Sequence, residues 1–183
     1  MEEISMKWKT VTIIVTEKCN LNCRYCYEDH KSGREIPIDV AKNIIFDEMT
    51  RDDFSEGVNI DFFGGEPFLN FSAIKELVDF IEKSNFKKPY TLFATTNGTL
   101  VHGEIQEWLK SKKGKFTCGL SLDGTKWMHD LNRSNSFDDI DLDFFATMYP
   151  YQLIKMTISQ ETLGGLYDGV VFCHRKGFRV GCN

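Results

Sequence analysis

The stretch VTIIVTEKCNLNCRYC (residues 11–26) joins a run of β-branched residues directly to three closely spaced cysteines. Val11–Val15 predicts a strand, because β-branched side chains fit a pleated, buried surface. Cys19, Cys23 and Cys26 follow it in the spacing CxxxCxxC. Three thiolates are one short of the four that close an iron–sulfur cube or a structural zinc site. The loop therefore predicts a metal centre with one open position, unless a distant residue supplies a fourth ligand.

Length and composition limit the classes of protein that fit. The 183 residues and the hydrophobic fraction of 42% suit one compact domain with a sizeable core. The net charge of −5, without a basic cluster, argues against a nucleic-acid partner. No N-terminal apolar run resembles a signal peptide, and no segment has the roughly 18 apolar residues of a membrane span. We therefore expect a cytoplasmic, reduced protein whose six cysteines are metal ligands or buried thiols.

Strand-like and helix-like segments alternate along the chain. The expected strands are Val11–Val15, Val58–Phe63, Tyr90–Thr95, Phe116–Leu122, Leu153–Ile158 and Phe178–Val180. The expected helices are Ile38–Met49, Ile74–Ile81, Ile105–Leu109, Phe137–Met148 and Gln160–Lys176, the last with Ser159 as N-cap and Gly177 as its end. Consecutive βα units build parallel sheets with helices outside. We therefore predict an α/β fold, an open partial (β/α)6 barrel of parallel strands.

The chemically distinctive motifs all follow expected strands. The cysteine loop follows the first strand, Gly64-Gly65-Glu66-Pro67 the second and Thr96-Asn97-Gly98 the third, while Ser121-Leu122-Asp123-Gly124 ends the fourth. The carboxyl ends of parallel strands converge on one face, where active sites lie. We therefore expect these four motifs to form one site.

This ordered set of motifs resembles the radical S-adenosylmethionine (radical SAM) superfamily. The segments Thr96-Asn97-Gly98-Thr99-Leu100 and His129-Asp130-x-x-Arg133 are similar to the branch with anaerobic sulfatase-maturating enzymes and peptide maturases. Those maturases carry a C-terminal SPASM or twitch cluster domain. The resemblance covers nearly the whole chain, with the motifs in the family's order.

The resemblance implies the chemistry of the site. Cys19, Cys23 and Cys26 would hold a 4Fe–4S cluster whose fourth iron chelates the methionine part of S-adenosylmethionine (SAM). One electron, from a donor such as flavodoxin or ferredoxin, would cleave SAM and leave a 5′-deoxyadenosyl radical. That radical would abstract hydrogen from a peptide or protein substrate. The implied enzyme is a peptide-modifying oxidoreductase of anaerobic metabolism.

The resemblance also assigns residues to SAM. Gly64 and Gly65 would take the methionine amino group through backbone carbonyls, on a loop shaped by Glu66 and stiffened by Pro67. Arg133 offers a planar fork that suits the SAM carboxylate. The other expected contacts are Ser121 through a hydrogen bond, Tyr25 near the adenine, Asn97 and Asp123.

Some of these residues have a simpler interpretation. Thr96-Asn97-Gly98 is equally compatible with a plain turn, and Asp123 with the turn that Asp-Gly favours. His129 and Asp130 are expected to order the loop that carries Arg133.

Two other classes of function stay open. Similar cysteine spacing serves glycyl-radical-enzyme activases and small-molecule radical SAM enzymes. A non-catalytic iron–sulfur or zinc-binding fragment would need a fourth ligand, from Cys118, Cys173 or Cys182. Cys118 is out of phase with Ser121, and Cys173 lies on an apolar helical stripe, so both are expected in the core. Cys182 is expected to be a buried or frayed-end thiol.

The end of the chain carries a further expectation. The sequence stops at or within the sixth strand, where family barrels continue with a helix and then the auxiliary-cluster domain. We therefore expect residues 1–183 to be a single core domain, excised from a longer enzyme and without its C-terminal domain. A sixth strand that nothing covers would leave an exposed sheet edge.

Overall fold

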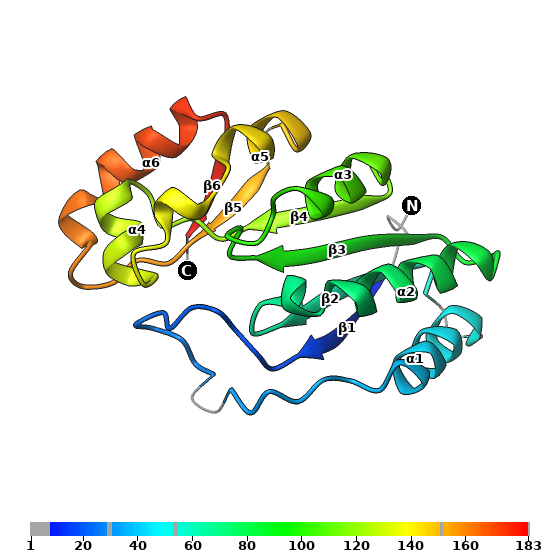
Figure 1. Cartoon of the computed structure of the whole chain (residues 1–183). Helices are drawn as coiled ribbons and strands as arrows, with labels where there is room; N and C mark the ends of the chain where they lie inside the picture. Colours follow the sequence, from blue (N-terminus) through cyan, green and yellow to red (C-terminus); the bar gives the residue numbers. More distant parts are fainter. Residues whose placement is uncertain (1–7, 29–30, 53–54, 151, 183) are drawn as a thin grey trace, which may run out of the picture.

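The strands of this computed structural model, which describes residues 8–28, 31–52, 55–150 and 152–182, all pair in parallel. The larger sheet contains, in spatial order, β1 (Trp8–Thr16), β2 (Gly57–Gly64), β3 (Tyr90–Thr96) and β4 (Phe116–Leu120). The smaller sheet pairs β5 (Leu153–Met156) with β6 (Arg179–Cys182). An isolated parallel bridge between Ser121 and Lys155 joins the sheets, so the strands form one open, curved wall (Figure 1).

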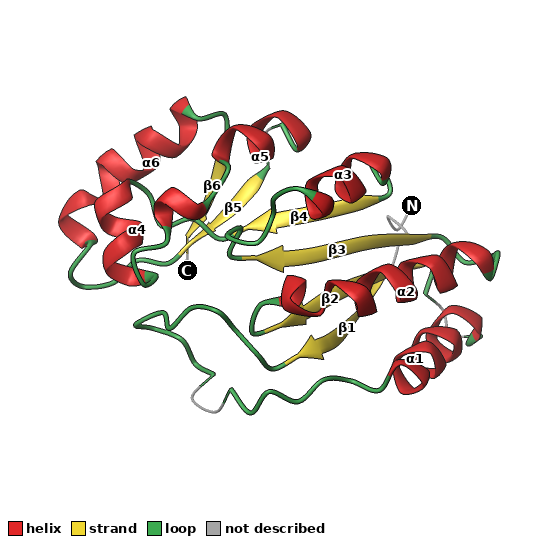
Figure 2. Cartoon of the chain, viewed as in Figure 1, coloured by secondary structure: helices red, strands yellow, loops and turns green. Residues whose placement is uncertain are grey.

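The helices cover the outer side of this wall (Figure 2). They are α1 (Ile38–Thr50), α2 (Phe71–Lys83), α3 (Glu104–Ser111), α4 (Lys126–Asn132), α5 (Leu142–Met148) and α6 (Leu166–Arg175). Three short 3₁₀ turns accompany them: η1 (Pro67–Asn70), η2 (Phe137–Asp139) and η3 (Leu163–Gly165). No helix in the described ranges is long and apolar enough to cross a membrane.

The core lies between the sheet and the helices. Alternate residues of each strand point outward into it, and the buried strand residues include Ile13, Ile60, Leu92, Cys118 and Ile154. The other residues of each strand line the inner side of the wall. The predicted α/β partial barrel of parallel strands with outer helices is thereby confirmed, and Cys118 and Cys173 are core thiols as expected.

One predicted helix was wrong in its extent. Phe137–Met148 divides into η2 and α5, because Asp141 starts a new helix. The Asp141 carboxylate accepts a hydrogen bond from the Phe144 N–H at 2.9 Å, which is an N-cap interaction.

Helix α4 was missed, since its seven residues are too few to show a helical period. His129 and Asp130, expected to order a loop that carries Arg133, belong to α4, and Arg133 is the C-cap of that helix.

The last predicted helix is shorter than expected. Helix α6 begins at Leu166, not at Gln160, and the Ser159 hydroxyl accepts a bond from the Thr162 N–H within the preceding turn at 3.3 Å. Gly177, at φ +88°, follows the helix in the left-handed conformation that commonly ends helices.

Cys182 is exposed at the end of β6.

Candidate active site

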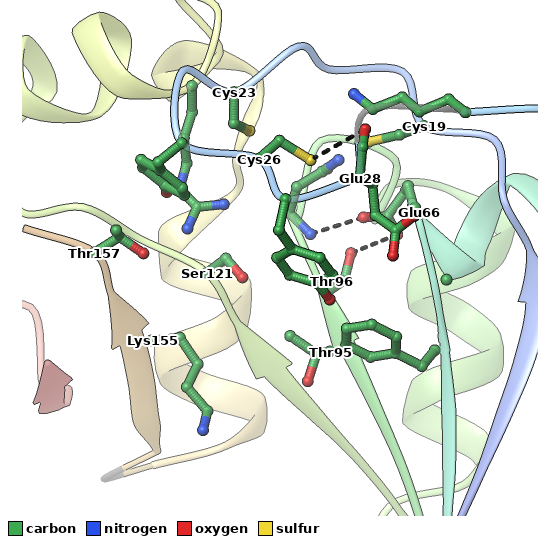
Figure 3. Close-up of a pocket in the computed structure, with 18 of the residues that line it drawn as sticks. Cys19, Cys23, Cys26, Glu28, Glu66, Thr95, Thr96, Ser121, Lys155 and Thr157 are labelled. Carbon is green, nitrogen blue, oxygen red and sulfur yellow. Dashed lines mark hydrogen bonds between the residues drawn. The ribbon is translucent and has the colours of Figure 1, made fainter. Parts of the chain in front are cut away.

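The motifs that follow the strands meet around one cavity of about 520 Å³ at the carboxyl ends of the strands (Figure 3). The predicted site residues that line it are Cys19, Cys23, Tyr25, Cys26, Gly64, Gly65, Glu66, Asn97, Ser121 and Arg133. Pro67 and Asp123 do not line it: Pro67 is buried in η1, and Asp123 lies fully buried behind the cavity wall. Parallel strand ends thus bring together residues that are more than 100 positions apart in the chain.

The cysteine loop is attached to the barrel through its backbone. The Arg24 N–H donates to the Asn132 carbonyl at the end of α4 at 3.0 Å. The Asn22 N–H donates to the Ser134 hydroxyl, also at 3.0 Å. These bonds connect the loop to the segment that carries Arg133, so the cysteines and the arginine are placed together.

Asn97 links the same loop to the end of β3. Its side-chain amide donates to the Asn20 oxygen at 3.0 Å, and its own oxygen accepts from the Thr99 N–H at 3.0 Å. Asn20 in turn donates to the Thr99 hydroxyl at 2.8 Å. Asn97 therefore forms a local turn and supports the cysteine loop at the same time.

The three thiols are half-buried and line the same cavity. Burial raises the pKa of Cys19 and of Cys23, and the positive charge of Arg133 opposes this rise at Cys23. Lys31, which donates to the Leu21 carbonyl, opposes it at both cysteines. Nearby cations stabilise thiolates, the form that binds iron. Among the described residues, no three His, Cys, Asp or Glu side chains are already gathered as a metal site. The three thiols that line this cavity are nevertheless donors of the type that holds an iron–sulfur cluster.

The two glycines after β2 lie against the protein's own backbone. A Cβ at Gly64, which has φ +154°, would be 2.1 Å from the Thr16 carbonyl oxygen. A Cβ at Gly65 would be 2.3 Å from the Lys18 carbonyl oxygen. Both positions therefore need glycine, because a side chain would collide with the backbone that leads into the cysteine loop. This requirement holds whatever ligand the cavity binds.

Glu66 joins the second motif to the third from a buried position. One carboxylate oxygen accepts from the Thr96 hydroxyl at 2.8 Å and from the Phe68 N–H at 3.2 Å, and the other accepts from the Asn97 N–H at 2.8 Å. Burial raises the pKa of Glu66 from 4.5 to about 7, although these hydrogen bonds favour the charged form. Glu66 thus shapes the cavity wall with a carboxyl group that is costly to ionise.

Glu66 should make the protein less stable as pH rises from about 4.5 to about 7. The folded state holds the Glu66 proton more tightly than the unfolded state, so folding is favoured at the acidic end of this window. The rise in the pKa of Glu66 corresponds to a loss of about 3 kcal/mol in the free energy of unfolding. Urea unfolding at pH 4.5 and at pH 7.5 should show a larger loss of stability between these two pH values in the wild type than in Glu66→Gln. Equal losses in the two proteins would refute the assignment.

Arg133 is anchored by a buried ion pair. Its Nε donates to Asp123 Oδ2 at 3.0 Å and its Nη2 to Asp123 Oδ1 at 3.3 Å. The Tyr25 hydroxyl donates to the same carboxylate at 2.6 Å, and the Thr157 N–H does so at 2.9 Å. The guanidinium also lies 5.3 Å from the centre of the Tyr25 ring, within cation–π range. The carboxylate of Asp123 therefore holds Arg133 and Tyr25 at the cavity from behind.

His129 fixes the same segment from the core side. Its Nδ1 accepts from the Asp123 N–H at 3.3 Å, so Nε2 carries the proton and donates to the Ser136 hydroxyl at 3.1 Å. That hydroxyl donates to the Arg133 carbonyl at 2.6 Å. Burial lowers the pKa of His129 to about 4, which keeps the imidazole neutral. His129 therefore has a supporting role, away from the cavity.

The structure adds cavity residues that the motifs did not indicate. They lie on the inner faces of the strands, just after β5 or after the cysteines: Tyr27, Glu28, Lys31, Asp61, Phe63, Phe93, Thr95, Lys155 and Thr157. The only signal for them in the sequence is a polar residue between apolar neighbours, such as Asp61 between Ile60 and Phe62.

Comparison with known proteins identifies a family and several relatives of this chain. The family described as "Radical SAM superfamily" matches residues 13–141. An uncharacterized protein of Methanocaldococcus jannaschii is 34% identical over 143 residues, which cover 77% of this chain and 48% of that protein. A cysteine-type anaerobic sulfatase-maturating enzyme of Clostridium novyi is 32% identical over 153 residues, covering 76% of this chain and 39% of the enzyme.

A solved structure shares the fold. "Native anSMEcpe with bound AdoMet and Kp18Cys peptide" superposes with a TM-score of 0.79 at 21% identity, covering 96% of this chain and 51% of that one. The chain thus spans about half the length, or less, of the proteins it matches. The match over residues 13–141, which contain the cysteine loop and the motifs around the cavity, shows that the chain belongs to the radical SAM superfamily.

Proposed function

We propose that the chain is the catalytic core of an enzyme that cleaves SAM reductively and abstracts hydrogen from a peptide or protein. The observation that carries the proposal is the meeting of Cys19, Cys23 and Cys26 with Gly64-Gly65 and Arg133 around one cavity. The cavity's volume of about 520 Å³ falls in the range of ligand sites for small molecules.

The residues divide into ligands and supports. Cys19, Cys23 and Cys26 would hold a 4Fe–4S cluster with one iron left for the methionine part of SAM. When bound, the reduced cluster and SAM supply a 5′-deoxyadenosyl radical. Gly64 and Gly65 would face the SAM amino group.

Arg133 would bind the SAM carboxylate. Its bonds to Asp123 use Nε and Nη2, so Nη1 is the guanidinium nitrogen outside that pair. Ser121 and Tyr25 would complete the SAM contacts, since both line the cavity. Asp123 supports Arg133 and is not proposed as a contact.

A peptide or protein substrate is supported by the relatives. The Clostridium novyi protein is a sulfatase-maturating enzyme, and the solved anSMEcpe structure contains the Kp18Cys peptide together with AdoMet. A one-electron donor such as flavodoxin or ferredoxin would supply the electron. Similar cysteine spacing serves glycyl-radical-enzyme activases and small-molecule radical SAM enzymes, so the substrate class needs a direct test.

The test is anaerobic reconstitution with iron and sulfide, followed by addition of SAM and dithionite. We expect about four irons per chain, by the stoichiometry of a single cluster, and formation of 5′-deoxyadenosine. Reconstituted protein that holds zinc instead of iron, or that leaves SAM intact, would contradict the proposal. Mass spectrometry of candidate peptides then distinguishes peptide chemistry from turnover of SAM alone.

A further inference from the structure

The inner face of β2 carries a carboxylate with one oxygen that has no hydrogen-bond partner among the described residues. Asp61 is flanked in the sheet by Thr12 on β1 and Phe93 on β3. Its Oδ1 is buried, and nothing in the described part of the chain makes a hydrogen bond to it. An unpaired buried acceptor costs free energy, so this position favours a ligand that donates a hydrogen bond.

Asn59, two residues earlier on the same face, shows the contrast. Its Oδ1 accepts from the Thr91 hydroxyl at 2.6 Å, and its amide donates to the Thr10 hydroxyl at 3.5 Å. The sheet therefore satisfies Asn59 with neighbouring strands and leaves Asp61, which lines the cavity, with an oxygen that has no such partner among the described residues.

Lys155 approaches the same cavity from β5, and Figure 3 shows its side chain extending below Ser121 and Thr157. No ion pair among the described residues joins Lys155 to Asp61. Burial raises the pKa of Asp61, and the positive charge of Lys155 opposes that rise. Asp61 is on β2 and Lys155 is on β5, with β3 and β4 between these strands. The carboxyl group and the ammonium group therefore lie on opposite sides of the inner face.

An aromatic ring forms the surface between these two charges. A Cβ at Gly119 of β4 would be 2.6 Å from Cζ of Phe93, so the Phe93 ring lies over Gly119. Phe93 and Lys155 also line a second cavity of about 610 Å³ on the side of the barrel where β4 and β5 begin. The ring thus forms an apolar floor of the upper cavity, with a carboxylate towards one side and an ammonium towards the other.

We propose that Asp61 and Lys155 together bind one amide unit of the substrate above the Phe93 ring. Asp61 accepts the amide N–H, and Lys155 donates to the amide C=O. A trans amide suits this arrangement because its N–H and C=O point in opposite directions from one planar, neutral group. This inference rests on the proposed peptide substrate and identifies the group of the peptide that the floor of the cavity recognises.

The test measures binding of three small probes to the cluster- and SAM-loaded chain by saturation-transfer NMR. The first probe is N-acetylglycine N-methylamide, an uncharged molecule with two amide groups. The other two probes are acetate and methylammonium. We expect saturable binding of the diamide, weakened about tenfold in Asp61→Ala and in Lys155→Met, as loss of a hydrogen bond to a charged group predicts. Asn59→Ala is the matched control and should bind the diamide like the wild type.

Three results would overturn the inference. They are no saturable binding of the diamide, an unchanged Kd in both variants, and tighter binding of acetate or methylammonium than of the diamide. The last would make the pair an ion site instead. Because the readout is binding, it is separate from the proposed function: diamide binding without SAM cleavage would refute only the reaction, and SAM cleavage without diamide binding would refute only the amide site.

Discussion

Replacing Cys23 by alanine should abolish both the iron–sulfur chromophore and the cleavage of SAM. Cys23 lies in the middle of the three-cysteine loop, half-buried at the cavity and within the field of Arg133. Two remaining thiolates cannot hold three irons of a cube, so the cluster should not assemble. Iron and sulfide analysis measures the loss of the cluster, and the visible absorption spectrum measures the loss of its chromophore. A 5′-deoxyadenosine assay measures the loss of SAM cleavage.

The matched control for this variant is Cys182→Ser. Cys182 is exposed at the end of β6 and does not line the cavity. Its replacement should leave iron content and SAM cleavage unchanged. The cluster assignment would fail if the Cys23→Ala protein retained full iron and sulfide content, or if Cys182→Ser lost its iron.

Replacing Asp123 by alanine should lower the free energy of unfolding by about 3–5 kcal/mol, the usual cost of leaving one partner of a buried ion pair uncompensated. Asp123 is fully buried and Arg133 nearly so, and the carboxylate also accepts bonds from Tyr25 and Thr157. Urea unfolding at pH 7 measures the loss. Adding Arg133→Met to Asp123→Ala should cost less than the sum of the single changes, because the double variant buries no lone charge.

An exposed aspartate provides the control for Asp123. Asp79 is on α2 and forms a surface ion pair with Lys83 at 3.5 Å, with about half of its side chain exposed. Asp79→Ala should change stability by less than about 1 kcal/mol. A loss in Asp123→Ala that is no larger than in Asp79→Ala would show that the buried pair does not stabilise this fold.

The sequence predicted the architecture because that depends on local patterns. Short apolar runs such as Val11–Val15 and the helical stripe Ile74–Ile81 each identify an element from its own residues. Their alternation leads to parallel strands with outer helices, and parallel strands place the following motifs at one end. The predicted meeting of the cysteine loop with Gly64-Gly65 followed from that order, whereas Arg133 was assigned to the site by the family resemblance. Helix α4 was not predicted, because seven residues are too few to show a helical period of apolar residues.

Only the tertiary structure showed which partner each polar group takes. The ion pair between Asp123 and Arg133 depends on how α4 returns the chain to the end of β4, which no periodic pattern records. The unsatisfied Asp61 and the facing Lys155 depend on the curvature that turns β2 and β5 towards a common space. A local pattern reports which face of an element is apolar, because burial acts on every residue of that face. Hydrogen bonds and ion pairs act over a few ångströms between distant residues, so they exist only after the chain has folded.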